Sequence, residues 1–468
     1  MQSVPSTAMP APKSDVRGLK LLLRAFRNRN YRLFFGGQII SLIGTFLTQV
    51  ATIWLVYRLS DKSALMLGVV GFSGQIPMFL LAPFAGVWVD RWNRRRLLVI
   101  TQALAMCQSF ALAALCFSPW LSVGGIIILS VVQGLINAFD VPGRQAFLVE
   151  MVESRDDLAN AIALNSTMVH AARLIGPAAA GVLIAYIGEK WCFFIDGCSY
   201  VGVIAAFLAM RVLPKPPRQH ETSVLHDLKE GFRYVSRSVP IRSLLLVMAL
   251  ISLTGMPAFS VLMPIFGDAL SRTVYLPFHH SLSAADAGAQ TLGFLMGASG
   301  VGAFCGALFL ASRRTVVGLG KVIALAAGTF GLAILAFALS RHFWLSVPIV
   351  MFAGAGMITT FASCNTLLQT LAEDDKRGRV MSFFTMAFVG MTPWGNLAAG
   401  AAAARLGGGV TGASHTLLIA GAAVLLIAAY FAARLPALRR LVRPIYVQKG
   451  ILPAVATSLR NAAEVTDV

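Results

Sequence analysis

Acidic residues are scarce in this chain. Only 20 of its 468 residues are Asp or Glu, against 39 Lys and Arg, and charged residues make up 13% of the total. Hydrophobic residues reach 57%, and the mean hydropathy is +0.73. A water-soluble protein of this length needs more polar surface than these residues supply. The composition therefore excludes an ordinary soluble protein. It also leaves no soluble domain that could carry the net charge of +19 as a nucleic-acid-binding surface.

Sequence motifs for catalysis are missing as well. The chain has no Gly-x-x-x-x-Gly-Lys-Ser/Thr loop for nucleotide phosphates, no His-Glu-x-x-His motif and no nucleophile elbow. Its six cysteines lie within or at the ends of apolar runs, and their spacing is not that of metal ligands. We therefore expect no enzyme activity, no cofactor and no metal site, and ATP is not the expected energy source.

Long apolar runs dominate the sequence. A run of about 20 apolar residues is long enough to cross a bilayer as a helix. Most loops between the runs are too short to hold a domain, so neighbouring helices must be antiparallel. We predict an all-α membrane protein with twelve transmembrane helices, at residues 33–57, 66–89, 97–118, 121–146, 162–187, 191–211, 243–269, 289–311, 319–339, 343–366, 380–403 and 414–434.

The longest polar stretch inside the chain separates two groups of six spans. Residues 212–240 open with prolines and continue as a predicted amphipathic helix. The first apolar run lacks an Ala-x-Ala-like cleavage site, so it is predicted to be a retained span and not a cleaved signal. We expect a cytoplasmic N-terminal segment, a six-helix bundle, a cytoplasmic linker, a second six-helix bundle and a cytoplasmic tail, at residues 1–32, 33–211, 212–242, 243–435 and 436–468.

Lys and Arg are distributed unevenly between the two sides of the predicted membrane. With the N-terminus inside, 32 of the 39 fall in interior segments and 6 in exterior loops. Positively charged residues concentrate on the cytoplasmic side of membrane proteins. We therefore predict that both termini are cytoplasmic. The positive net charge is then mostly a feature of membrane orientation, and it can also attract anionic lipid.

One interior loop concentrates arginine. Its sequence is "GVWVDRWNRRR", residues 86–96. It resembles the Gly-x-x-x-Asp-Arg/Lys-x-Gly-Arg/Lys-Arg/Lys loop between helices 2 and 3 of the major facilitator superfamily, with matching residues at Gly86, Asp90, Arg91, Arg94 and Arg95. Asn93 replaces the second glycine of that pattern, and Asn can also adopt a left-handed turn.

Two further stretches narrow the resemblance. "NAFDVPGRQAFLVEMV" and "ARLIGPAAAGVLI" resemble the enterobactin-exporter-like branch of drug/proton antiporters, of the transmembrane secretion effector type. The resemblance covers nearly the whole chain. It implies the major facilitator fold, in which two related six-helix bundles surround a central cavity, and it implies a multi-pass protein of the bacterial inner membrane.

The resemblance also implies a function. We expect a secondary active transporter, a proton-coupled exporter of a small amphipathic compound such as a siderophore or drug, working by alternating access. Its expected partners are the substrate, protons and the lipid bilayer, with no nucleic acid, and we expect a functional monomer. A lysophospholipid flippase or a metabolite importer of the same fold stays open. A polytopic membrane enzyme or a sensor is the alternative from a different class.

The arginine loop has two interpretations. It can anchor the topology by its charge alone, or it can form a network on one side that breaks when the halves rock. Asp140 precedes Arg144 by four residues, which favours an ion pair on a helix; a pair that only neutralises itself stays open. Under the second interpretation an inner gate is formed by Gly86, Asp90, Arg91, Arg94, Arg95, Asp140 and Arg144.

Polar residues recur at helical spacing inside four of the predicted spans. They cannot all face lipid, so they must converge on each other or on water. Hydrogen bonds from helix to helix are the alternative to a role in transport. The substrate or proton pathway candidates from these stripes are Gln38, Thr45, Gln49, Gln133, Asn137, Ser363 and Asn396.

Two further pathway candidates lie near the middle of the predicted span 162–187. Arg173 has His170 one turn away, and we expect no carboxylate at that depth in any span. The arginine can attract an anionic substrate, or it can satisfy carbonyls at a Gly-rich helix contact. His170 can carry a proton or be a hydrogen-bonded core residue.

Glycines relate the two halves of the chain. Gly176 and Gly181 recur as Gly395 and Gly400, at an offset of 219 residues. Together with Pro177, the first two form a predicted helix-packing motif, because small residues let membrane helices approach closely. Two similar halves around a midplane site are the architecture expected of a secondary transporter.

Overall fold

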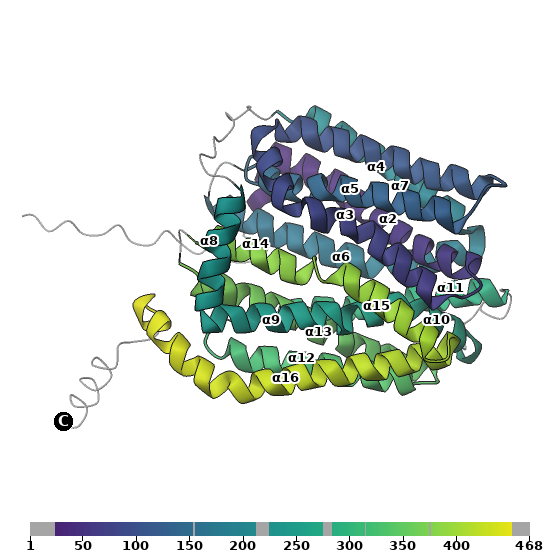
Figure 1. Ribbon diagram of the computed structural model, residues 1–468. Coiled ribbons are helices and arrows are strands. Elements are labelled where there is room, and N and C mark those ends of the chain that lie inside the picture. Colours follow the sequence, from purple (N-terminus) through teal and green to yellow (C-terminus); the bar gives the residue numbers. More distant parts are fainter. Residues whose placement is uncertain are drawn as a thin grey trace, which may run out of the picture.

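The computed structural model describes residues 24–152, 155–211, 224–274, 283–313, 315–373 and 376–451. Within these ranges all regular secondary structure is helical (Figure 1). The helices are η1 Arg24–Arg27, α2 Arg29–Leu59, α3 Ala64–Arg91, α4 Arg94–Phe117, α5 Val123–Leu148, α6 Arg155–Ile187, α7 Glu189–Ala209, α8 Val224–Arg237, α9 Val239–Leu253, α10 Gly255–Leu270, η2 Ser271–Thr273, α11 Ala284–Ala311, α12 Leu319–Leu339, α13 Phe343–Leu371, α14 Arg377–Phe388, α15 Thr392–Arg405 and α16 Gly409–Gln448.

Eleven of the twelve predicted spans are confirmed by helix length and hydropathy in the described part of the chain. The remaining one, 380–403, is not a single helix, because α14 ends at Phe388 and α15 begins at Thr392. Pro393 at the start of α15 has no N–H to donate to the preceding turn, so the helix breaks there. The span predicted at 243–269 is confirmed as part of one helical stretch, Val239–Thr273, within which α9 ends at Leu253 and α10 begins at Gly255.

The spans form two groups that follow one another along the chain (Figure 1). In the first group α7 packs against α2 and α4, and α5 packs against α3. In the second group α13 lies between α11 and α12, and α12 packs against α16. The main contacts between the groups are those of α6 with α11 and of α3 with α15. The helix α8 lies in the segment between the groups, where Glu230 accepts from Arg379 of α14 at 2.7 Å.

Glycine pairs allow the close approach of the two groups. A Cβ atom on Gly293 of α11 would lie 2.6 Å from the Cα of Gly181 on α6, and one on Gly400 of α15 would lie 2.9 Å from the Cα of Gly68 on α3. Neither contact leaves room for a side chain. Gly400 is the sequence repeat of Gly181, so the repeated glycines occupy corresponding crossings in the two halves.

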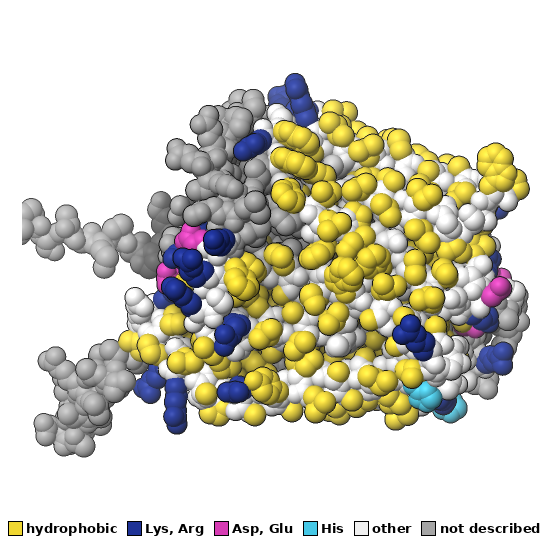
Figure 2. Space-filling model, viewed as in Figure 1, with side chains coloured by type: hydrophobic (Ala, Val, Ile, Leu, Met, Phe, Trp, Pro, Cys, Tyr) yellow, Lys and Arg dark blue, Asp and Glu magenta, His cyan; other side chains and the backbone are white. Residues whose placement is uncertain are grey.

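The surface is divided into an apolar middle and charged ends. In Figure 2 hydrophobic side chains cover the broad centre of the molecule, and most of the visible Lys and Arg lie toward the end that carries α8. Large exposed hydrophobic side chains on the spans include Leu80, Ile128 and Leu325. This distribution matches a protein whose middle is surrounded by lipid tails. We call the end that carries α8 the basic end and the other the outer end.

Candidate functional site

The polar residues of α2 point in two directions. Thr48 donates to Asp196 of α7 and Ser41 is buried, whereas Gln49 is exposed and Thr45 is exposed beside Tyr200 of α7. Ile40, which is 61% exposed, lies roughly on the opposite side of the helix from Gln49, as expected for a lipid-facing position. Thr45 and Gln49 are therefore accessible polar residues of α2, and Gln49 is directed away from the lipid.

The polar stripe of α5 is bonded mainly within the first group of helices. Gln133 donates its Nε2 to Oδ1 of Asn137 at 3.1 Å, one turn farther along. Asp140 is 4% exposed and pairs with Nε of Arg144 at 2.8 Å. Its other oxygen accepts from Thr101 at 2.9 Å and from Gln102 at 2.7 Å, both on α4. The described partners of the Asp140–Arg144 pair thus lie within the first group of helices.

The other two stripes lie largely at helix contacts. Ser363 on α13 is fully buried, and its Oγ has no hydrogen-bond partner among the described residues. Asn396 on α15 is 2% exposed and lies against Gly68 and Gly71 of α3, at the contact between the two groups. Gln38 on α2 is also buried, and its Oε1 likewise has no partner in the described part of the chain. These positions resemble packing sites more than an open cavity wall.

The arginine loop is tied to its own half of the protein. Arg94 pairs with Glu150, just beyond α5, at 2.5 Å. Arg95 donates to the carbonyls of Phe207 at 2.8 Å and Leu208 at 2.6 Å, at the end of α7 where backbone oxygens lack helical partners. Arg91 is exposed. Glu150 carries no local sequence signal, because its partner is 56 residues away.

Asn93 does not adopt the left-handed turn that was considered for this position. Asn93 has φ −67° and ψ 108°, and its side chain accepts from the N–H of Arg96 at 3.0 Å. It therefore caps the first turn of α4, a position that Asn favours. Gly86 and Asp90 belong to α3 by their backbone, but their side chains lie outside the part of the structure that is described.

Arg173 stacks on an aromatic ring. Its guanidinium lies 5.7 Å from the centre of the Phe46 ring on α2, a cation–π distance. No described carboxylate pairs with it. His170 is half-buried, and its Nδ1 has no hydrogen-bond partner among the described residues. Neighbouring Gly176 packs on Phe46, and the carbonyl of Pro177 lies at the crossing with α11.

Asp196 on α7 contradicts the expectation that no carboxylate lies at the depth of Arg173. Both residues face the same stretch of α2, since Asp196 accepts from Thr48 at 2.8 Å and Arg173 stacks on Phe46. Asp196 also accepts from Ser109 of α4 at 2.8 Å and is 1% exposed. The apolar context "FFIDGCSY" gave the only sequence signal, a single acid inside a span.

An ion pair joins the two halves at the outer end. Nζ of Lys62, in the loop between α2 and α3, lies 2.6 Å from Oδ2 of Asp268 on α10, and the hydroxyl of Tyr57 donates to the same oxygen at 3.2 Å. Asp61 and Lys62 have φ of 50° and 66°, which is uncommon for residues with a side chain. We call Tyr57, Lys62 and Asp268 the outer clasp.

The clasp and the glycine crossings lie toward the same end of the molecule. Gly68 is in the first turns of α3, directly after the loop of Lys62, and Gly181 is near the end of α6. The ion pairs described at the basic end, such as Arg94–Glu150 and Asp140–Arg144, lie within one half. The described polar contacts thus join the halves at the outer end.

Solved transporter structures share this arrangement of helices. The nucleoside transporter NupG superposes with a TM-score of 0.65 over 89% of this chain and 99% of its own, at 14% identity. A bacterial homologue of the iron transporter ferroportin, in an inward-facing state, gives a TM-score of 0.63 over 86% of this chain and 98% of its own, at 17% identity. At such identities the likeness shows the fold alone.

Sequence relatives are transporters as well. The staphyloferrin A transporter of Staphylococcus aureus is 24% identical over 370 residues, which is 78% of this chain and 87% of the relative. The multidrug efflux pump Tap of Mycolicibacterium fortuitum is 25% identical over 406 residues, covering 85% and 93% of the two chains. A family model described as "transmembrane secretion effector" matches residues 22–442. The chain is therefore a multi-pass membrane transporter and not an enzyme, and it belongs to the transmembrane secretion effector family of the major facilitator superfamily.

Proposed function

We propose that this transporter is a proton-coupled exporter of small amphipathic compounds, siderophore- or drug-like, and that it works by alternating access. The observation that carries the proposal is the one-sided closure of the molecule. The outer clasp and the glycine crossings close the outer end, while Thr45 and Gln49 of α2 stay exposed. Export then requires a second state in which the outer clasp opens and the basic end closes.

The inner gate of this cycle consists of the charged residues at the basic end. Arg95 fixes the end of α7 and Arg94 fixes Glu150, so the loop is rigidly attached to the first half. In the second state the same surface meets the second half, and Asp90 and Arg91 are the residues we assign to that contact. A network that exists in only one state biases the equilibrium between the two.

Asp196 is the residue that we assign to the proton. Oδ2 accepts from Thr48 and Ser109, Oδ1 has no hydrogen-bond partner among the described residues, and no described cation pairs with the carboxylate. Keeping a charge buried without a cation costs free energy, which protonation removes. The hydrogen bonds of Asp196 join α7 to α2 and α4, so a change in the charge of Asp196 acts on the packing of three helices.

The position of Arg173 favours a substrate that carries an anionic group. A guanidinium within a membrane span is costly unless an anion or a polar group offsets it, and here an aromatic ring is its described partner. A carboxylate-bearing siderophore would supply such an anion. Neutral or cationic drugs would not, so the choice between the two substrate classes depends on this residue.

The test is transport into inverted membrane vesicles under an imposed pH gradient, with staphyloferrin A and ethidium as probes. The wild type should concentrate at least one probe, and a protonophore should abolish the gain. Accumulation that is unaffected by the protonophore would contradict proton coupling, and no movement of either probe would contradict this substrate range.

Asp196→Asn tests the proton assignment. Thr48 and Ser109 can still donate to the amide oxygen, so we expect normal folding, loss of accumulation against a gradient, and retained downhill exchange. Asp61→Asn is the matched control, because Asp61 is exposed and Asn tolerates its left-handed backbone. Full gradient-driven accumulation by Asp196→Asn would exclude Asp196 as the proton carrier.

A further inference from the structure

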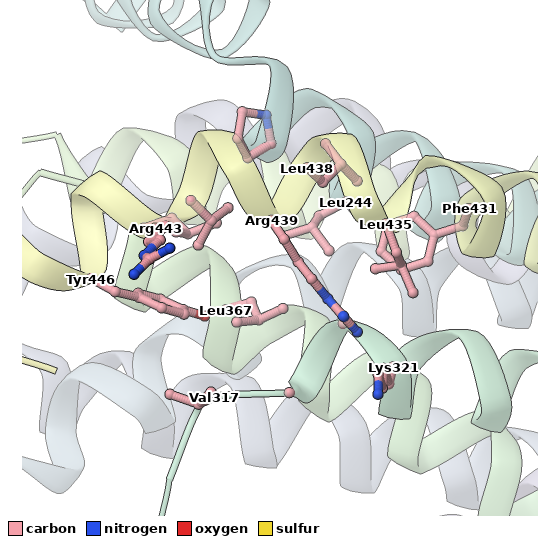
Figure 3. Close-up of a pocket in the computed structure, with 15 residues that line it drawn as sticks. Leu244, Val317, Lys321, Leu367, Phe431, Leu435, Leu438, Arg439, Arg443 and Tyr446 are labelled. Atoms are coloured by element: carbon pink, nitrogen blue, oxygen red, sulfur yellow. The ribbon is translucent and has the colours of Figure 1, made fainter. Parts of the chain in front are cut away.

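A cavity lies on the second half of the protein, away from the outer clasp and from α2. Its volume is about 400 Å³, and it lies between α9, α12, α13 and α16 (Figure 3). Leu244, Leu367, Phe431, Leu435 and Tyr446 form most of its apolar wall. This size and composition are typical of a pocket for a small apolar group.

Three cations border this apolar wall. Lys321 lies in the first turn of α12, and Arg439 and Arg443 belong to α16. Figure 3 shows the side chain of Arg439 extending from α16 toward Lys321. All three are exposed, no acidic residue lines the cavity, and none of the three forms an ion pair with a described residue. The rim therefore carries a concentrated positive charge without a counter-ion in the described part of the chain.

The length of α16 places the cavity at the edge of the lipid tails. The helix has 40 residues and continues past Pro436 and Pro444. At about 1.5 Å per residue it spans about 60 Å, twice the thickness of the hydrocarbon core. The cavity lies along the second half of this helix, from Phe431 to Tyr446, toward the basic end of the molecule. The rim is therefore at the level of lipid headgroups.

We propose that this cavity binds an anionic phospholipid from the leaflet at the basic end. The acyl chain occupies the apolar wall, and the headgroup phosphate is held by Lys321, Arg439 and Arg443. Arginine and lysine both bind phosphate by charge-assisted hydrogen bonds, and Arg can do so with two parallel N–H donors. The bound lipid adds a polar link between α16 and the start of α12, beside the apolar contact of Leu435 with Gly320.

Native mass spectrometry of the full-length protein in detergent tests this site. The probes are dioleoyl-phosphatidylglycerol, which is anionic, and dioleoyl-phosphatidylcholine, which is zwitterionic. The wild type should retain phosphatidylglycerol preferentially. Each arginine removed should lower that preference about fivefold, so Arg439→Gln/Arg443→Gln should lower it about 25-fold. Arg440→Gln is the matched control, because Arg440 is exposed on the same helix but does not line the cavity.

A second pair of variants separates the cavity from general surface charge. Leu244→Trp fills the apolar wall and leaves the cations in place, so it should also reduce the retained phosphatidylglycerol. Deletion of residues 452–468, which contain Glu464 and Asp467, should leave lipid binding unchanged. The proposal is overturned if the wild type shows no preference, if Arg440→Gln loses as much as the double variant, or if Leu244→Trp binds normally. It is also overturned if the deletion increases binding, since the tail would then be the occupant.

Discussion

A single methyl group at Gly293 should hold the two halves apart at the outer end. In Gly293→Ala the new Cβ would lie 2.6 Å from both the Cα of Gly181 and the carbonyl oxygen of Pro177. These are backbone atoms, which cannot move aside by changing a rotamer. Overpacking of this kind costs about 1–3 kcal/mol. The cost applies only to the state in which α6 and α11 touch at this point.

The expected size of the effect follows from this difference between states. A penalty of about 1–3 kcal/mol on one state shifts the equilibrium about 5- to 150-fold toward the other. Ala is the better helix former by about 1 kcal/mol, but α11 is helical in both states, so this gain cancels. We therefore expect Gly293→Ala to populate the state that is open at the outer end.

Spin-label distances across the outer end measure this shift. In a variant without native cysteines, labels at Trp120 and Arg341 would report the two halves from exposed positions near the ends of their helices. Gly293→Ala should lengthen the distance distribution. Gly328→Ala on α12 is the control, since a Cβ there meets nothing within 4 Å. An unchanged distribution for Gly293→Ala, or an equal change for Gly328→Ala, would refute the reasoning.

Three further outcomes are expected. Asp268→Asn should increase the population that is open at the outer end by at most about fivefold, because a partly exposed ion pair contributes only about 0.2–1 kcal/mol. Adding Lys62→Gln should change the label distances no further. An additional shift would mean that the two residues act separately. Arg144→Ala should lower the free energy of unfolding by about 3–5 kcal/mol, because it leaves the buried Asp140 charge without its cation. In thermal unfolding, Asp140→Asn/Arg144→Ala should recover much of that loss. Additive losses from the two substitutions would contradict a shared network. Arg173→Gln should weaken binding of anionic ligands more than of neutral ones in a titration of purified protein, and equal losses would reject a substrate-anion role.

Much of the fold could be predicted from the sequence, because lipid exposure imposes long apolar runs that hydropathy alone reveals. The break between α14 and α15 could not. Pro142 and Pro177 lie inside continuous helices, whereas Pro393 marks a break. A proline in a membrane helix is tolerated or disruptive according to what its neighbours supply to the freed carbonyl, and those neighbours come from other helices.

The candidate site was less accessible to sequence reasoning. The Asp140–Arg144 pair follows from a spacing of four residues. Lys62 and Asp268 are 206 residues apart, and Asp196 depends on hydroxyls 148 and 87 residues away. No local pattern encodes such partners. Polar stripes, too, indicated that their residues avoid lipid, but the choice between a cavity and a helix contact needed the positions of the facing helices.

The glycine crossings have a thermodynamic consequence. When most side chains are buried at a contact they lose rotamer freedom, at a cost of up to about 2 kcal/mol each, but glycine has none to lose. Where Gly181 meets Gly293, and Gly68 meets Gly400, the halves can therefore part and rejoin without ordering or releasing side chains at the points of closest approach. Parting and rejoining at these crossings therefore changes side-chain entropy little.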